Sequence, residues 1–148
     1  MGGNVAIKPR SSKSKGRRLQ QFVKDSILKA WDRLQPGDVR STAMGQSGVD
    51  IQLSPYAKSL IPLAIETKNV EKLNVWAAID QAKANAQKEG LVEAVIISRN
   101  NLPEPYAILP WKFVLILLRM SSHVPTSPNP PPRYDDLFFD GVAWLDKL

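Results

Sequence analysis

Two carboxylates and one lysine lie near the middle of the chain, on two consecutive segments that alternate between apolar and other residues. One segment is residues 49–53, which contains Asp50, and the other is residues 63–68. Successive side chains of a strand point to opposite faces, so Glu66 and Lys68 must share a face. If the two segments pair as neighbouring strands, Asp50 can face the same point. The spacing therefore predicts two carboxylates and an ammonium group in one place.

This combination suits the hydrolysis of phosphodiesters. A carboxylate on a buried strand is costly unless it is paired, and a divalent cation removes that cost. A metal held by carboxylates lowers the pKa of a bound water and offsets charge on the scissile phosphate, and a neighbouring lysine can orient that water. The chain has no cysteine and one histidine, His123. We therefore expect oxygen ligands and Mg²⁺, with Mn²⁺ able to substitute. A D…E-x-K pattern alone also fits a surface salt bridge, and the apolar strand context is what favours a catalytic site.

The elements that would position these residues follow from hydrophobic periodicity and turn residues. Helices are expected over residues 17–34 and 74–89, and strands over 39–42, 49–53, 63–68, 92–98 and 105–109. Residues 54–59 fit a loop or a short helical turn, and residues 111–118 fit a final apolar helix or a strand. This order predicts an α/β fold in which a central mixed β-sheet is flanked by helices.

Composition divides the chain into four parts. Residues 1–15 are expected to form a flexible basic arm, residues 16–120 a folded domain, residues 121–132 a proline-rich linker, and residues 133–148 an acidic and aromatic tail. The tail can pack on its own core or bind a partner. No signal peptide is visible and the longest apolar run is too short to span a bilayer, so a cytoplasmic protein without membrane contact is expected.

The net charge of +6 is concentrated at the N-terminal end, where residues 1–40 carry ten basic and three acidic residues. Such asymmetry fits a polyanionic partner, either nucleic acid or an anionic membrane, or simply a solubilising segment. Phosphate contacts are expected from side chains at the start of the first helix and in the segments that lead into Asp50. They are Lys13, Lys15, Arg17, Arg18, Arg40 and Ser47.

The motifs Gly48-Val49-Asp50-Ile51 and Ile65-Glu66-Thr67-Lys68 resemble those of the PD-(D/E)XK nuclease superfamily. The stretch IETKNVEKLNVWAAIDQAKANA is similar to phage-encoded, Holliday-junction-resolvase-like endonucleases, and the resemblance covers about residues 15–118. It implies a restriction-endonuclease-like core in which a helix precedes the G-x-D strand, the E-x-K strand follows, and another helix comes next. It also implies that Asp50, Glu66 and the Thr67 carbonyl bind the metal, and that Lys68 is the catalytic lysine.

Two glutamines extend the comparison. Resolvases of this type carry a glutamate in the first helix, whereas this chain has Gln20 at the matching position, on the border of the apolar stripe. Gln20 is either a neutral ligand near the metal and the DNA or a solvated helix edge, so the resemblance supports a nuclease more firmly than a resolvase. Gln81 occupies a position that relatives place near the active site, and it fits either that role or the surface of the helix.

The resemblance implies an endonuclease that cuts branched DNA in phage recombination, replication or packaging, in the bacterial host, as a homodimer. Three alternatives stay open. One is a sequence-specific restriction-like or homing nuclease, another is a catalytically silent DNA-binding protein with the same fold, and the third is an adaptor that binds a partner through the proline-rich linker and the tail.

Overall fold

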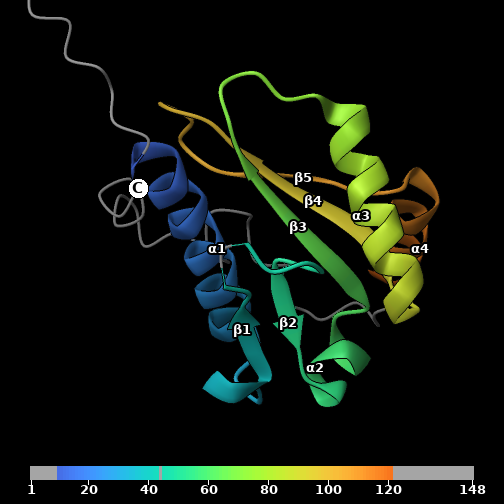
Figure 1. The fold of residues 1–148 in the computed structure, drawn as a ribbon. Helices are drawn as coiled ribbons and strands as arrows, with labels where there is room; N and C mark the ends of the chain where they lie inside the picture. The colour runs from blue at the N-terminus through green and yellow to red at the C-terminus, as the bar shows by residue number, and fades with distance from the viewer. Residues whose placement is uncertain (1–9, 44, 122–148) are drawn as a thin grey trace, which may run out of the picture. The chain divides into compact units, whose positions relative to one another are not determined.

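The structure is a computed structural model that describes residues 10–43 and 45–121 (Figure 1). The chain divides into two compact units, residues 1–108 and residues 109–148. The first contains α1 (Arg10–Ala30), the 3-10 turn η1 (Pro36–Asp38), β1 (Val39–Ser41), β2 (Ile51–Leu53), α2 (Pro55–Leu60), β3 (Leu63–Asn69), α3 (Val75–Glu89), β4 (Val92–Ser98) and β5 (Tyr106–Ile108). The second contains α4 (Trp111–Ser121). Most of the expected basic arm, nearly all of the expected proline-rich linker and the whole expected tail lie outside the described residues.

The first unit is built on a five-stranded sheet with the order β1-β2-β3-β4-β5. β1, β2 and β3 form an antiparallel meander, β3 and β4 are parallel, and β5 is antiparallel to β4. Parallel neighbours need a crossover connection, and α3 provides it between β3 and β4. The predicted α/β class with a mixed sheet flanked by helices is therefore confirmed.

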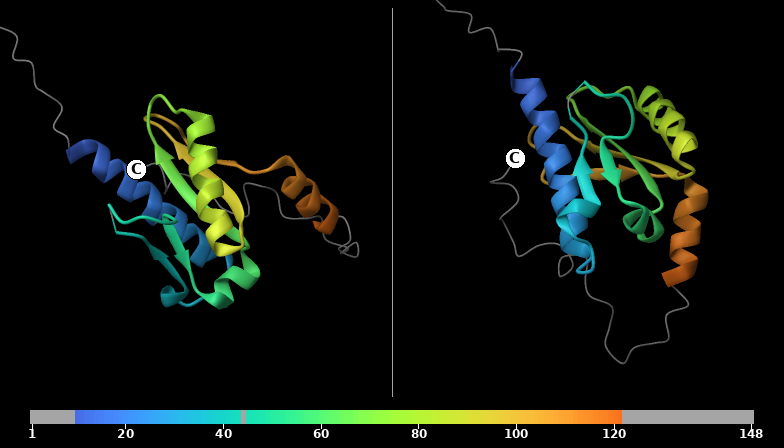
Figure 2. Two further views of the ribbon diagram at one scale, coloured as in Figure 1. Left: turned by 45° about the vertical axis from the view of Figure 1, so that its right-hand side comes forward. Right: turned by 60° about the horizontal axis from the view of Figure 1, so that its bottom comes forward.

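Helices α1 and α3 lie on opposite sides of β3 (Figures 1 and 2). Three alanines of α3, at positions 78, 82 and 86, are buried against the sheet and let the helix approach it closely. Ala86 packs with Ala64 of β3, which places the even-numbered residues of β3 on the α3 face. Asn69 donates from Nδ2 to the Lys15 carbonyl at 3.2 Å, so the odd-numbered residues face α1.

Two helices differ from the sequence prediction. α1 begins at Arg10 and ends at Ala30, so residues 10–15, which were expected to belong to a flexible arm, are helical. Their polar composition gives no apolar period to detect, whereas the bond from Asn69 fixes the Lys15 carbonyl. α2, which the sequence left as a loop or a turn, is a helix because the Ser54 side chain caps it by accepting from the Ala57 amide at 3.1 Å.

The second unit also differs from the expected boundaries. The apolar segment expected to close the folded domain belongs to residues 109–148, and it is a helix rather than a strand. Its first turn is formed by the Pro110 carbonyl, which accepts from the amides of Phe113 and Val114. Within the described ranges, no helix combines the length and apolarity that crossing a membrane requires.

Candidate active site

Glu66 stands in the middle of β3, with its side chain only 3% exposed. Its Oε1 accepts from Lys68 Nζ at 2.8 Å and from Gln81 Nε2 at 2.6 Å. Lys68 also donates to Gln81 Oε1 at 2.9 Å. The three side chains thus form a closed triangle between β3 and α3. The sequence placed Glu66 and Lys68 on one face correctly, and Gln81 lies beside them rather than on an unrelated part of the helix surface.

The second carboxylate oxygen of Glu66 has a different environment. Oε2 is buried and accepts no hydrogen bond from the described residues. Burial raises the pKa of Glu66, although the bond from Lys68 opposes that shift. A buried acceptor without a partner carries a desolvation cost. Oε2 is therefore the atom of the site that most needs a cation.

Asp50 lies immediately before β2 and is held by the next strand. Its Oδ2 accepts from the Thr67 amide at 2.7 Å and from Thr67 Oγ1 at 2.9 Å, while its own amide donates to the Ile65 carbonyl at 3.1 Å. These bonds fix the carboxylate against β3. Its negative charge contributes to the raised pKa of Glu66, so the two carboxylates are close enough to repel each other.

The turn that leads into Asp50 depends on Gly48, which has φ of +113°. Residues with a Cβ rarely adopt this conformation. The Gly48 carbonyl accepts from Asn85 Nδ2 at 3.1 Å, and the adjacent Val49 carbonyl accepts from Thr42 Oγ1 at 2.6 Å. Side chains from α3 and from the segment after β1 therefore hold the turn at both residues that precede Asp50.

Asn85 is a residue of the site that the sequence analysis missed. It is 9% exposed, and its amide lowers the pKa of Glu66, against the effect of burial. A signal was present in the sequence, because Asn85 follows Gln81 by four residues and therefore lies on the same side of the helix. An asparagine on the alanine-lined side of α3 is a polar residue in an otherwise apolar stripe.

The donor atoms at this point are oxygens, the ligands that Mg²⁺ prefers. Asp50 and Glu66 supply carboxylate oxygens. The N–H and C=O groups of one strand residue point the same way, so the Thr67 carbonyl faces the Asp50 side, as its amide does. No cluster of three His, Cys, Asp or Glu residues suited to a metal occurs in the described part of the chain. Mg²⁺ fits such a limited set, because it is commonly bound by one or two carboxylates together with waters and substrate phosphate.

The cations expected to bind DNA fall into two groups. Lys13, Arg17 and Arg18 are exposed on the N-terminal half of α1, and Lys15 is half-buried there. The bond from Asn69 to the Lys15 carbonyl brings this part of α1 to the end of β3 that carries Lys68, on the opposite face of the sheet.

Two other residues expected to bind DNA lie nearer to Asp50. Arg40 is exposed on β1, and Ser47 is exposed in the turn beside Gly48.

Gln20 of α1 is 7% exposed, so its interpretation as a solvated helix edge is wrong. Gln20 lies on the same side of α1 as the buried Val23 and Ile27, three and seven residues later, which explains its burial.

The chain matches no protein-family model, no curated protein and no solved structure.

Proposed function

We propose that the chain is a metal-dependent endonuclease of the PD-(D/E)XK superfamily that hydrolyses phosphodiester bonds in branched DNA. The observation that carries this proposal is the buried Glu66 carboxylate, whose Oε2 lacks a hydrogen-bond partner while Asp50 lies beside it. A buried carboxylate next to a second carboxylate is unfavourable in a purely structural role, and a divalent cation between them removes the penalty. The neighbouring lysine separates this arrangement from a simple cation-binding site.

In the proposed mechanism Asp50, Glu66 and the Thr67 carbonyl would hold Mg²⁺ or Mn²⁺. Such a metal, when bound, would lower the pKa of a water molecule and offset charge on the phosphate. Glu66 is divided between two tasks, since Oε1 is occupied by Lys68 and Gln81 while Oε2 is left for the cation. Lys68 is 27% exposed, so its ammonium group is accessible from solvent and can offset charge that develops on the phosphate.

The arrangement of elements supports the finer assignment to a restriction-endonuclease-like core. α1 precedes a three-stranded meander, the turn before β2 carries Asp50, β3 carries Glu66 and Lys68, and α3 follows. Apart from α2, which lies between β2 and β3, this is the order that the resemblance implies. The preference for branched DNA and the action as a homodimer rest on the resemblance, from which the chain departs at Gln20, where resolvases carry a glutamate.

A cleavage assay tests the proposal. The protein is incubated with a four-way junction, a flap, a linear duplex and a single strand, each with Mg²⁺, with Mn²⁺ or with a chelator. Symmetric cuts confined to the junction support the branched-DNA nuclease, and cuts at one duplex sequence instead support a restriction-like or homing enzyme. Binding of DNA without cleavage of any substrate in either metal overturns the nuclease proposal and favours a silent DNA-binding protein.

Variants locate the chemistry. Asp50→Asn and Lys68→Met should each abolish cleavage while leaving DNA affinity nearly unchanged, because neither removes the basic surface of α1. Lys88→Met is the matched control, since it removes one exposed lysine near the end of α3 and should cut normally. Cleavage that survives either site variant shows that the site is wrong.

A further inference from the structure

The sheet face that bears the carboxylates continues onto β2. Ile51 of β2 is the register partner of Ile65, and Ile65 points away from the face of Glu66. Alternation along β2 therefore puts Gln52 on the same face as Glu66, while Asp50 lies just before the strand with its carboxylate held by Thr67. α3 packs on β3 and β4, and the Gln52 side chain is exposed. The β2 part of this face is thus open to solvent directly beside Asp50.

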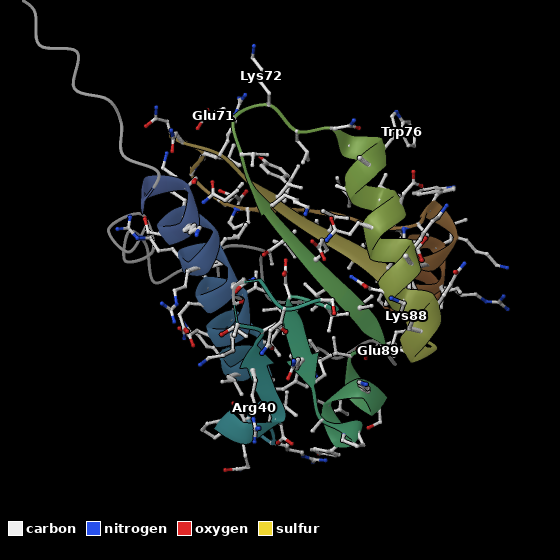
Figure 3. The ribbon with its side chains drawn as sticks, in the orientation of Figure 1. Arg40, Glu71, Lys72, Trp76, Lys88 and Glu89 are labelled. Carbon is white, nitrogen blue, oxygen red and sulfur yellow. The ribbon has the colours of Figure 1, made fainter. Side chains whose placement is uncertain are left out.

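The open face extends across β1 as well. Arg40 is the register partner of Gln52, and directly opposite residues of antiparallel strands project from the same face, with their Cβ atoms about 5 Å apart. The Arg40 side chain is exposed and projects from β1 (Figure 3). Arg40 and Gln52 therefore leave the sheet from the same face, and the Arg40 guanidinium reaches back toward Gly37 of η1.

Gln52 also lines a polar hollow of about 300 Å³. Its walls include Ser47 and Gly48 of the turn before Asp50, Gln52 of β2, Lys58 of α2 and Glu89 at the end of α3. Ser47, Gln52 and Lys58 all present hydrogen-bond donors to it. The hollow shares Gly48 with the candidate active site, because Asn85 binds the Gly48 carbonyl.

Lys58 is already engaged in an ion pair, at 2.7 Å from Glu89 Oε2. Both side chains are partly solvent-exposed, at 35% and 28%, and ion pairs of this kind contribute little to stability. A phosphate group offers Lys58 a stronger anionic partner at little cost. Glu89 and its neighbour Lys88 lie at the C-terminal end of α3 in Figure 3.

We propose that Arg40, Gln52 and Lys58 form a backbone-binding track for the nucleic-acid strand that leads into the Asp50–Glu66 site. Arg40 and Lys58 contact successive phosphates, and Gln52 lies between them as a neutral donor. On binding, Lys58 leaves Glu89 for a phosphate. The inference rests on the proposed function, and it adds a path for the strand across β1 and β2 that is distinct from the basic surface of α1.

The test compares two variants of the same ion pair. DNA affinity is measured in the presence of chelator over a series of salt concentrations for the wild type, Lys58→Gln and Glu89→Gln. Lys58→Gln should weaken binding roughly fivefold to tenfold at about 0.1 M salt and reduce the salt slope by about 0.9, the effect of one lost phosphate contact. Glu89→Gln should strengthen binding several-fold, because Lys58 then has no competing partner. Lys83→Gln, which removes an exposed lysine from α3, is the matched control and should bind like the wild type.

The track predicts that Lys58→Gln weakens DNA binding and that Glu89→Gln strengthens it. A purely structural ion pair predicts that both substitutions change DNA affinity in the same direction, because each breaks the pair. Equal behaviour of Lys58→Gln and Lys83→Gln overturns the track. Gln52→Glu is a second probe, since it places a negative charge on an exposed position and should weaken binding at least as much as Lys58→Gln. If these binding results hold but no substrate is cut, the nuclease proposal fails while the track stands; if cleavage occurs without them, only the track fails.

Discussion

Gln81 and Glu66 are joined by a hydrogen bond of 2.6 Å from Nε2 to Oε1, which links the middle of α3 to the middle of β3. The other end of the same amide accepts from Lys68 at 2.9 Å. A glutamine can do this because it carries a donor and an acceptor on one planar group. Gln81 therefore orients both the carboxylate and the lysine of the proposed site, from a helix that the chain reaches only after leaving β3.

The first prediction concerns this glutamine. Gln81→Ala should lower kcat by about tenfold to a hundredfold, the usual cost of removing a residue that orients metal-binding and catalytic groups. KM for DNA should change little, since Gln81 is not expected to bind the DNA backbone. Multiple-turnover cleavage over a range of concentrations of the best substrate measures both. Gln87→Ala makes the same change on the exposed surface of α3 and should leave cleavage intact. Equal loss in both variants would mean that Gln81 only supports the helix.

The second prediction concerns the pH dependence of the metal-free protein. Burial raises the pKa of Glu66 above its ordinary value of 4.5, so the folded chain holds this proton more tightly than the unfolded chain does. The contribution of Glu66 to the free energy of unfolding is therefore complete below about pH 4.5 and is lost as the pH rises through the raised pKa. Glu66→Gln should remove this loss of stability with rising pH, because the glutamine side chain does not ionise. Urea unfolding of both proteins in chelator, from about pH 4 to 8, measures it.

Binding of Mg²⁺ should offset the loss of stability that ionised Glu66 causes in the metal-free protein. Mg²⁺ at about a hundred times its dissociation constant should stabilise the wild type by roughly 2.7 kcal/mol at neutral pH and should not stabilise Glu66→Gln. Parallel pH profiles of the two metal-free proteins, or equal stabilisation of both by Mg²⁺, would contradict the interpretation of Glu66 as a buried carboxylate that awaits a cation.

Strand alternation was sufficient to predict much of the site. Period-two patterns located β2 and β3, and the parity of positions 66 and 68 fixed their shared face before any tertiary information was needed. The α/β class followed in the same way from the order of the elements. These are local properties, in which each residue's neighbours in sequence determine its direction.

The features that escaped prediction depend on contacts between distant parts of the chain. The bond that fixes the Lys15 carbonyl comes from Asn69, 54 residues later, so the start of α1 has no signature in its own sequence. Asn85 acquires its role only because α3 crosses over β3 and meets the Gly48 turn, 37 residues earlier. The helical pattern of the sequence predicts which side of α3 is buried, but it does not predict which residues of other elements that side contacts.

The third prediction isolates the backbone conformation at Gly48. A Cβ at Gly48 or at Gly16 would meet no atom within 4 Å, so the two positions differ in conformation and not in space. Gly48 has φ of +113°, and Gly48→Ala should destabilise the fold by roughly 1–3 kcal/mol and displace Asp50, with loss of cleavage. Gly16 lies inside α1, where Gly16→Ala should stabilise by about 0.4–1 kcal/mol. Urea unfolding of both variants measures the contrast, and equal effects would refute it.

The fourth prediction concerns the tie between α3 and the turn before Asp50. Asn85→Ala removes the donor to the buried Gly48 carbonyl and should cost about 1–3 kcal/mol of stability. It also removes an amide that lowers the pKa of Glu66, so that pKa should rise further and the pH at which cleavage reaches half its maximum should rise with it. The pH profile of single-turnover cleavage measures the shift. Loss of stability with an unchanged pH profile would reduce Asn85 to a purely structural residue.

The last prediction separates the role of the α1 cations in DNA binding from their role in folding. Lys13 lies in the first turn of α1, where the helix dipole disfavours a cation, and no acidic residue in that turn offsets it. Replacing Lys13 and Arg17 by glutamine should therefore stabilise the fold by roughly 0.3–1 kcal/mol while reducing the salt slope of DNA binding by about 1.8. Point substitutions are needed because deletion of the N-terminal segment would also remove the Lys15 carbonyl that Asn69 binds.

The control for this experiment replaces Lys29 and Arg33 by glutamine, which removes the same number of exposed charges at the same spacing near the other end of α1. That variant should be slightly destabilised, because a cation near a helix C-terminus is favourable, and its salt slope should match that of the wild type. If the start of α1 binds phosphate, stability should rise and DNA affinity should fall in the Lys13 and Arg17 double variant alone. If both double variants reduce the salt slope equally, the charge of α1 acts through the general field of the protein and not through phosphate contacts at the start of the helix.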